Sequence, residues 1–529
     1  MRASSTTRQS DVDGGAGDGA PPRTGPERAP DGVLAARSRG RTTTDRTGGA
    51  AAVAWSAVLT VAAALLTVLL ALAGRYGPHR DELYFVEAGR HLAWGYPDQP
   101  PLTPLLARAA DLVAPGSLFA LHTVAALAVA GTVVLSGVLA AELGGRSSAQ
   151  VLTAVGVGTG AVVVALGHIL STATLDLLLW TAITYAVLRV LRRDDARGWL
   201  VVGLLGGLGV ENKLTTALLL VAVALGVLLT PPVRHHLRTA WFWGAAGVVA
   251  LIGLPAVLWQ ASHGWPEVTL AREIRLENVT VGGRVGYVAL VLVLLGPLVT
   301  AIWVYGLVRL WRVPALGAAR PFAWAFAALF VLFLGTGGKG YYLVGLLPVL
   351  VAAGTCGLVE RWSVPEARRA VVILAVVGAI AWPASLPLLP ARGYDGSFYA
   401  AMNADQAETI GWTPLVRAVD GAATVGHATA IVTANYGEAG ALDWYGAPVP
   451  VYSGHNGYGG WGPPPGATGP IVLVGYDTAP DWASGCRTVA RVDTGKGIDN
   501  QEQGASVMLC AGPAGTWSDV WPRVRHLDA

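Results

Sequence analysis

Apolar segments long enough to cross a lipid bilayer recur along most of this chain. A run of about 18 or more apolar residues is typical of a membrane-spanning helix, because no water is present in the bilayer to bond its backbone. The first run covers 50–73, and further runs lie at 118–141, 150–167, 173–191, 199–211, 213–230, 240–260, 285–308, 321–335, 341–359 and 370–389. The pattern predicts a polytopic α-helical membrane protein with about 11 transmembrane helices.

Composition and charge exclude several classes of function. Hydrophobic residues make up 53% of the 529 residues, and the mean hydropathy is +0.50. The formal net charge of +3 is small and its basic residues are scattered between apolar runs, so nucleic-acid binding is not expected. The three cysteines show no metal-ligand spacing. We therefore expect no bound metal, and the chain offers no motif for a cofactor.

The two ends of the chain differ from its apolar middle. Residues 1–48 have few large apolar side chains and are predicted to be a disordered tail. The first apolar run begins too late and is too long for a cleaved signal peptide. Residues 49–391 are predicted to form the transmembrane domain, with a first outer loop at 74–117, and 392–529 a small α/β domain in which strand-like segments alternate with a short helix. Whether Cys486 and Cys510 form a disulfide there is left open by the sequence.

Arginine placement predicts the orientation of the chain. Arginine-rich short loops usually stay in the cytoplasm. Such loops fall on alternate connections, at Arg146, Arg192 to Arg197, Arg234 to Arg238, Arg309 to Arg320 and Arg361 to Arg369. We therefore expect the N-terminal tail to be cytoplasmic, and the first loop and the C-terminal domain to be extracytoplasmic, in a multi-pass protein of the plasma membrane.

The segment GRYGPHRDELYFVEAGRHLAWGYPDQPPL, beginning at Gly74, concentrates charge in that outer loop. Asp81 and Glu82 stand at the expected start of an interfacial helix. A helix cap and a catalytic base both need a carboxylate there, and the residues leave both readings open, although nothing at Tyr84 completes a capping box. The other charges, at Arg75, Arg80, Glu87 and Arg90, are expected on the solvated face of that helix.

Asp98 is held in a stiff turn by the prolines around it. It can cap the following helix, or it can serve as a second acid facing a shared cavity.

Ionisable residues at the outer ends of apolar runs are the other candidates for a site, since such groups are costly in a membrane. Lys213 interrupts one run beside Glu211, and Lys339 follows a Gly-rich turn. Each could be an interfacial lysine, Lys213 also a local partner of Glu211, or each could bind a phosphate. Asp176 could simply hydrogen-bond the free backbone groups at the start of its own helix.

Aromatic and polar residues mix in two segments of the C-terminal region, TANYGEAGALDWYG and VYSGHNGYGGWGPPP. Turn chemistry with buried aromatics accounts for them, but sugar-binding loops use the same mixture. The possible sugar or acceptor contacts, from these segments and from the outer helix ends, are Tyr84, Asp176, Tyr342, Asn435, Tyr436, Glu438, His455 and Asn456.

The order of these motifs resembles the membrane glycosyltransferases of the GT-C class, and within it glycosyltransferase family 39, which includes protein O-mannosyltransferases, aminoarabinose transferases and RgtA/B/C/D-like enzymes. DELYF, YPDQPPL, NKLTTALLL, KGYYLVGLLPVL, NYGEAGALDWYG and VYSGHNGY carry the resemblance, over about 50–510.

That resemblance implies an inverting transfer of a hexose or pentose from a polyprenyl-phosphate donor to a hydroxyl acceptor on lipid, cell-envelope glycan or protein. It assigns Asp81 as the base, with Glu82 beside it and Asp98 as the acid before Pro-Pro. Gln99 stands where the aminoarabinose branch has a lysine, so Lys213 and Lys339 are the expected donor-phosphate ligands.

A lipid-linked sugar flippase or transporter is the alternative function. Acids and lysines within a helical bundle also serve coupled transport. No internal repeat is visible, and a transporter does not require a large outer domain. The enzyme is therefore the favoured hypothesis.

Overall fold

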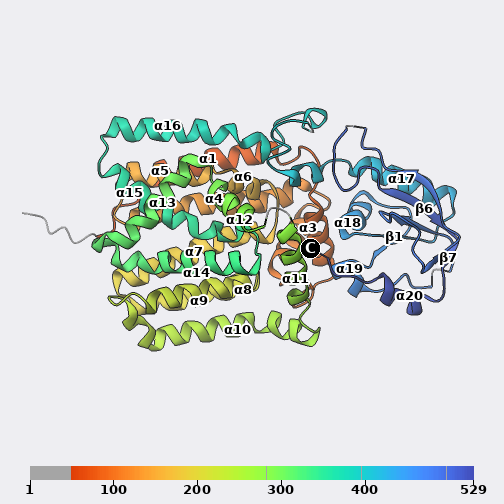
Figure 1. The fold of residues 1–529 in the computed structure, drawn as a ribbon, viewed down its shortest axis with the longest axis horizontal. Helices are drawn as coiled ribbons and strands as arrows, with labels where there is room; N and C mark the ends of the chain where they lie inside the picture. The colour runs from red at the N-terminus through yellow and green to blue at the C-terminus, as the bar shows by residue number, and fades with distance from the viewer. Residues whose placement is uncertain (1–48, 281–282, 395, 467, 496, 529) are drawn as a thin grey trace, which may run out of the picture. The chain divides into compact units, whose positions relative to one another are not determined.

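The computed structural model describes residues 49–280, 283–394, 396–466, 468–495 and 497–528. The tail predicted for residues 1–48 lies outside the described residues. Elements are labelled as in Figure 1, which shows the α/β part at one end of the long helices.

Seven helices of the described chain are long and apolar enough to cross a membrane. They are α1 (Trp55–Leu72), α4 (Leu118–Glu142), α7 (Thr172–Arg193), α10 (Ala240–Ser262), α14 (Arg320–Thr336) and α15 (Leu347–Val359), the last two each with a preceding 3-10 segment, and α16 (Val364–Ile380) with a following one. Such a set confirms the polytopic α-helical class.

Two bent helix pairs raise that number to nine if each pair is one span. They are α5 (Ser147–Gly158) with α6 (Ala161–His168), bent by 64°, and α12 (Gly283–Val293) with α13 (Pro297–Arg312), bent by 94°. Two shorter apolar helices, α8 (Trp199–Val210) and α9 (Thr215–Leu228), complete the bundle. The predicted count of about 11 spans counted both short helices, and it stays a prediction.

Arginines join several loops at the end of the bundle away from the α/β part. Arg146 donates to the carbonyl of Val359, over 2.6 Å. Arg193 pairs with Glu142 at 2.8 Å, and Arg309 with Glu360 at 2.9 Å. Loops that the arginine pattern assigned to one side of the membrane therefore share one end of the bundle.

The C-terminal region is an α/β layer structure. Its elements are α17 (Trp412–Val425), β1 (Ala430–Thr433), α18 (Tyr436–Tyr445), β2 (Val451–Ser453), α19 (Asn456–Trp461), β3 (Ile471–Val474), β4 (Ala483–Ser484), β5 (Arg487–Arg491), β6 (Ser506–Cys510), β7 (Gly512–Pro513) and α20 (Trp517–Val524). The main sheet has the order β2-β1-β3-β6-β5, in which β1 is parallel to β2 and β3, and the last two pairings are antiparallel. The predicted α/β character of this region is confirmed; its boundary at residue 392 stays a prediction.

Alternating apolar side chains bury both faces of the main sheet. Ile431 and Val472 pack against α17 and α18 on one face, whereas Val432 and Leu473 pack against the tryptophans of α20 on the other. Helices on both faces explain why these strands are near-continuous apolar runs.

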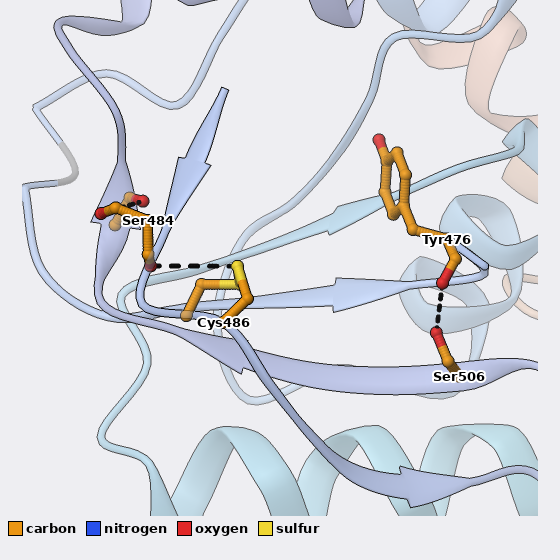
Figure 2. The surroundings of a disulfide bond; sticks show 6 residues. Tyr476, Ser484, Cys486 and Ser506 are labelled. Atoms are coloured by element: carbon orange, nitrogen blue, oxygen red, sulfur yellow. Dashed lines mark hydrogen bonds between the residues drawn. A yellow bond between two sulfur atoms is a disulfide. The ribbon is translucent and has the colours of Figure 1, made fainter. Parts of the chain in front are cut away.

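A disulfide joins Cys486, just before β5, to Cys510 at the end of β6. Figure 2 shows this bond next to Ser484, with Ser506 of the same strand β6 donating to the carbonyl of Tyr476. The pairing that the sequence left open is therefore present, and it cross-links the start of the edge strand β5 to its neighbour β6.

Helices α2 (Arg80–Arg90), α3 (Leu102–Val113) and α11 (Pro266–Thr280) lie between the bundle and the α/β part. The prediction that α2 is an interfacial helix is wrong, because Leu83 to Val86 are all buried and α2 packs against α18. Arg75 and Arg90 are exposed as predicted, whereas Arg80 and Glu87 are partly buried. Gly440 permits this contact, since a Cβ there would lie only 2.7 Å from the Cβ of Leu83. The charged loop thus lies between the helical bundle and the α/β part.

Candidate functional site

Helix α2 begins with a capping box formed by His79 and Glu82. The backbone N–H of Asp81 donates to the His79 side chain over 3.2 Å, and the N–H of His79 donates to Oε2 of Glu82 over 2.9 Å. Tyr84 completes no capping box with Asp81, as expected, and the box that does form begins two residues before Asp81. Asp81 is therefore not the cap of this helix.

Glu82 is fully buried and points away from the cavity described below. Besides the His79 N–H, it accepts the backbone N–H of Leu170 over 2.8 Å and lies 3.3 Å from Nε2 of His122. Contacts of this kind fix the start of α2 against α4 and the α6–α7 turn. The carboxylate thus has a structural use that accounts for its contacts, and it is not placed to touch a substrate in the cavity.

Asp81 lies one residue earlier and faces the cavity. Its Oδ1 accepts a 2.8 Å hydrogen bond from the hydroxyl of Tyr436, and its Oδ2 lies 3.8 Å from Nδ1 of His79. Burial favours a raised pKa for Asp81, but His79, Arg80, the Tyr436 hydroxyl and Lys339 together outweigh it, so the pKa is lowered. Asp81 is therefore ionised at neutral pH, and no hydrogen bond from a described residue occupies its Oδ2.

Asp98 is held by two donors from different parts of the chain. The Tyr84 hydroxyl donates to Oδ1 over 2.9 Å, and Nδ2 of Asn456 donates to Oδ2 over 3.2 Å. Helix α3 is capped by Pro101 without a side-chain bond, so Asp98 is not its cap. Burial raises the pKa of Asp98 to about 7, with the Asp81 charge acting in the same direction. The two acids therefore differ in protonation although they share a cavity.

A cavity of about 380 Å³ brings together most of the predicted site residues. Those lining it are Asp81, Tyr84, Asp98, Lys213, Lys339, Tyr342, Tyr436 and Asn456. Their elements include α2, α18 and the loops before α3, α9 and α15, which are distant in the sequence. Tyr84 and Tyr436 stack with ring centroids 4.8 Å apart and form one wall.

Lys213 and Lys339 line the same cavity without an ion pair to any described residue. The ammonium of Lys213 lies 4.4 Å from the ring centroid of Tyr342. Glu211 does not pair with Lys213, so the expected local partner is not the explanation of this lysine. Two cations with no described carboxylate within ion-pair distance can bind an anion in the cavity.

The remaining predicted residues lie outside this cavity. Asp176 accepts from Nδ2 of Asn212 over 2.8 Å, and Asn435 forms a second capping box with Glu438 at the start of α18. His455 accepts the N–H of Tyr436 over 3.3 Å and lines a neighbouring cavity of about 270 Å³ together with Asn435. The structure thus gives Asn435 and Glu438 a helix-capping role.

Two charged residues in or beside the site, Glu267 and Arg80, were not predicted as site residues from the sequence. Glu267, in the first turn of α11, lines the cavity, and burial raises its pKa to about 7, against the lowering effect of Lys213. Arg80 was expected on a solvated face, but its guanidinium carbon lies 6.0 Å from the Tyr436 ring centroid. Both sit at helix starts, where charged residues are common, so no sequence signal distinguished them.

One group of potential metal ligands occurs within the described ranges, at Asp194, His235 and His236. The Nε2 atoms of both histidines approach the same oxygen of Asp194, at 2.8 and 3.2 Å. This group belongs to the end of α7 and the turn before α10, and it does not line the cavity.

Comparisons with known proteins agree with this architecture. Residues 98–259 match the family model described as dolichyl-phosphate-mannose-protein mannosyltransferase. The structure of ArnT from Cupriavidus metallidurans bound to undecaprenyl phosphate is similar, with a TM-score of 0.54 and 15% identity over 87% of this chain and 98% of ArnT. The apo structure of ArnT gives a TM-score of 0.56 and 13% identity, over 86% and 97%. No curated protein matches significantly by sequence.

The described fold is therefore that of the GT-C class membrane glycosyltransferases. The predicted GT-C class is confirmed at the level of the fold, and the likeness to ArnT covers 87% of the chain.

Proposed function

We propose that this chain is an inverting glycosyltransferase that moves a sugar from a polyprenyl-phosphate donor to a hydroxyl acceptor. The observation that supports it most directly is a cavity in which the ionised carboxylate of Asp81 shares the lining with Lys213 and Lys339, neither of which forms an ion pair with a described residue. The ArnT fold and the undecaprenyl phosphate named with it support the same donor class.

Lys213 and Lys339 bind the donor phosphate in this proposal. When the bond from the anomeric carbon to the phosphate oxygen breaks, its electron pair remains on the phosphate. Fixed cations stabilise the negative charge that develops there, and they act more strongly in a partly dry cavity than in water. The tyrosine faces beside Lys213 hold the ammonium in place without neutralising it.

Asp81 acts as the general base. An acceptor oxygen attacks the anomeric carbon opposite the departing phosphate, its proton passes to Oδ2 of Asp81, and the configuration inverts. Asp98 has both oxygens bonded by Tyr84 and Asn456, so it is less suited to accept that proton. We assign Asp98 to binding a sugar hydroxyl, and Glu82 to positioning the helix that presents Asp81.

The reaction takes place on the extracytoplasmic side, with the N-terminal tail in the cytoplasm. Support comes from the arginine loops, four of which are joined by three bonds at the opposite end of the bundle from the site. Whether the sugar is a hexose or a pentose depends on contacts that the resemblance does not specify.

The test uses the full chain in lipid nanodiscs with radiolabelled polyprenyl-phosphate sugars. Asp81→Asn is expected to lower transfer by at least about 100-fold, in the range of general-base loss. Lys213→Gln and Lys339→Gln are expected to weaken donor binding by about tenfold each. Asp477→Asn, an exposed acid away from the cavity, is the matched control and should leave transfer unchanged.

Two outcomes contradict this proposal. Undiminished transfer by Asp81→Asn removes Asp81 as the base. Movement of labelled lipid between leaflets of sealed vesicles, with no glycosylated product under any condition, supports the flippase alternative instead.

A further inference from the structure

A second and larger cavity, of about 800 Å³, adjoins the candidate site. Its walls come from the loop between α2 and α3, the turn between α10 and α11, and the α19 and α20 regions of the α/β part. The volume lies within the range of about 300–1,000 Å³ typical of sites that enclose a small molecule. None of the residues assigned above to donor phosphate lines it, so it is available to another ligand.

Two flat aromatic pairs line this cavity. The rings of His91 and Trp461 stack with centroids 4.4 Å apart and an interplanar angle of 13°. Trp259 and His263 stack at 4.0 Å and 14°. Gly95 leaves room for the indole of Trp259, because a Cβ there would lie 3.0 Å from the ring. Both indoles are partly exposed where they line the cavity, and aromatic rings in such cavities pack against the apolar faces of sugar rings.

The charge of the lining is positive. Arg525 and His526 line the cavity beside the two stacked histidines, and no Asp or Glu does among the described residues. Arg525 is exposed, and its guanidinium makes no hydrogen bond or ion pair with a described residue. The carboxylate of Glu87 lies 3.3 Å from Nδ1 of His91, and this contact raises the pKa of His91, which favours the imidazolium form. The cavity is therefore built for an anionic ligand.

Asn456 connects this cavity to the candidate site. It lines both cavities, and its side chain donates to Asp98. Pro97, the residue before Asp98, also lines the larger cavity. A ligand that fills the larger cavity can thus extend past Asn456 toward Asp98 and Asp81.

We propose that the larger cavity binds the acceptor, and that the acceptor is an acidic carbohydrate. The tryptophans cover its sugar faces, and Arg525 with His526 binds its carboxylate or phosphate. This inference rests on the proposed glycosyl transfer, whose acceptor it specifies. The acidic sugar can belong to a free glycan or to a membrane-anchored glycolipid, since both present the same chemistry to these side chains.

Binding without donor tests the proposal independently of transfer. The full chain in nanodiscs is titrated with tri-galacturonic acid and with neutral maltotriose, followed by tryptophan fluorescence and saturation-transfer NMR. We expect the acidic trisaccharide to bind at least about tenfold more tightly than the neutral one, because an ionised hydrogen-bond partner adds specificity. In a second arm, the free trisaccharide is replaced by an acidic glycolipid incorporated into the nanodiscs. This arm distinguishes a membrane-anchored acceptor from a free one.

Two variants locate the site. Arg525→Gln is expected to weaken acidic-sugar binding about tenfold and to leave neutral-sugar binding unchanged. Trp259→Leu should weaken both. Arg523→Gln is the matched control, because Arg523 lies two residues earlier, in the last turn of α20, pairs with Asp481 at 3.3 Å and does not line the cavity.

Equal affinity for the acidic and neutral sugars, or unchanged acidic-sugar binding by Arg525→Gln, overturns the proposal. So does the absence of binding to every sugar in both arms. None of these results affects the transfer assay with Asp81→Asn, so failure of the acceptor assignment and failure of the proposed enzyme remain distinguishable.

Discussion

The hydroxyl of Tyr436 donates a 2.8 Å hydrogen bond to Oδ1 of Asp81 across 355 positions of the sequence. It links α18 of the α/β part to the first turn of α2. Because this hydroxyl helps to keep Asp81 ionised, the C-terminal region takes part in the site and is more than an appended domain.

Tyr436→Phe removes that hydrogen bond and keeps the ring that stacks on Tyr84. The Asp81 pKa is raised by burial and lowered by His79, Arg80, the Tyr436 hydroxyl and Lys339, so loss of the hydroxyl moves it upward. We expect the acidic limb of the pH–rate profile for transfer to shift to higher pH, and the rate at neutral pH to fall about threefold to tenfold. Tyr452→Phe, on strand β2, is the control; equal profiles for both variants contradict the prediction.

Asp98 predicts a pH dependence of stability. Burial raises its folded-state pKa to about 7, above the usual value of 3.8. A carboxyl with a raised pKa stabilises the folded state fully at pH values below its unfolded-state pKa, and this stabilisation is lost as pH rises through the folded-state pKa. We expect the Tm to fall as pH rises from about 5 to 8.

Asp98→Asn removes this contribution, so its Tm should fall less steeply over the same range. The Tm of this variant should still fall somewhat with pH, because burial also raises the pKa values of Glu267, Glu438 and Asp443 to about 7. Asp477→Asn should retain the full slope, and a wild-type Tm that rises with pH contradicts the assignment.

Glu82→Ala separates positioning from catalysis. The substitution leaves the backbone N–H groups of His79 and Leu170 without their partner in a buried place, which costs about 3 kcal/mol or more. We expect a marked loss of Tm in a thermal-shift assay. Glu366→Ala removes the equivalent capping contacts at the exposed start of α16 and should have a much smaller effect. Equal losses would show that burial of the Glu82 contacts does not matter.

Reduction of the Cys486–Cys510 disulfide is expected to destabilise the α/β part. A cross-link between cysteines separated by 24 positions restricts the unfolded chain by about 3 kcal/mol. The Tm of the wild type should therefore drop in reducing agent, whereas that of Cys486→Ser/Cys510→Ser should be low already and unaffected. Cys356→Ser, at the buried free cysteine, is the control.

The lining of the cavity shows which site residues could be predicted from the motifs. Asp81 and Asp98 were predicted from the charged outer loop and the family resemblance, and Lys213 and Lys339 from charges at the ends of apolar runs; all four line it. Asn435 and Glu438 were predicted from the same polar and aromatic mixture as Tyr436, yet they cap α18. Residue type and spacing do not distinguish a capping amide or acid from a ligand-binding one, because both need the same oxygen and nitrogen atoms.

The sequence by itself determined the polytopic helical class, the α/β character of the C-terminal region and the segments that supply the site, because apolar periodicity and charge at helix ends are local properties. Only the tertiary structure decided which of two adjacent acids faces the cavity. Successive side chains on a helix point roughly 100° apart, so Asp81 faces Tyr436 and the cavity while Glu82 turns into the protein toward Leu170 and His122. That choice depends on the packing of α18 and α4 around α2, which no local pattern encodes.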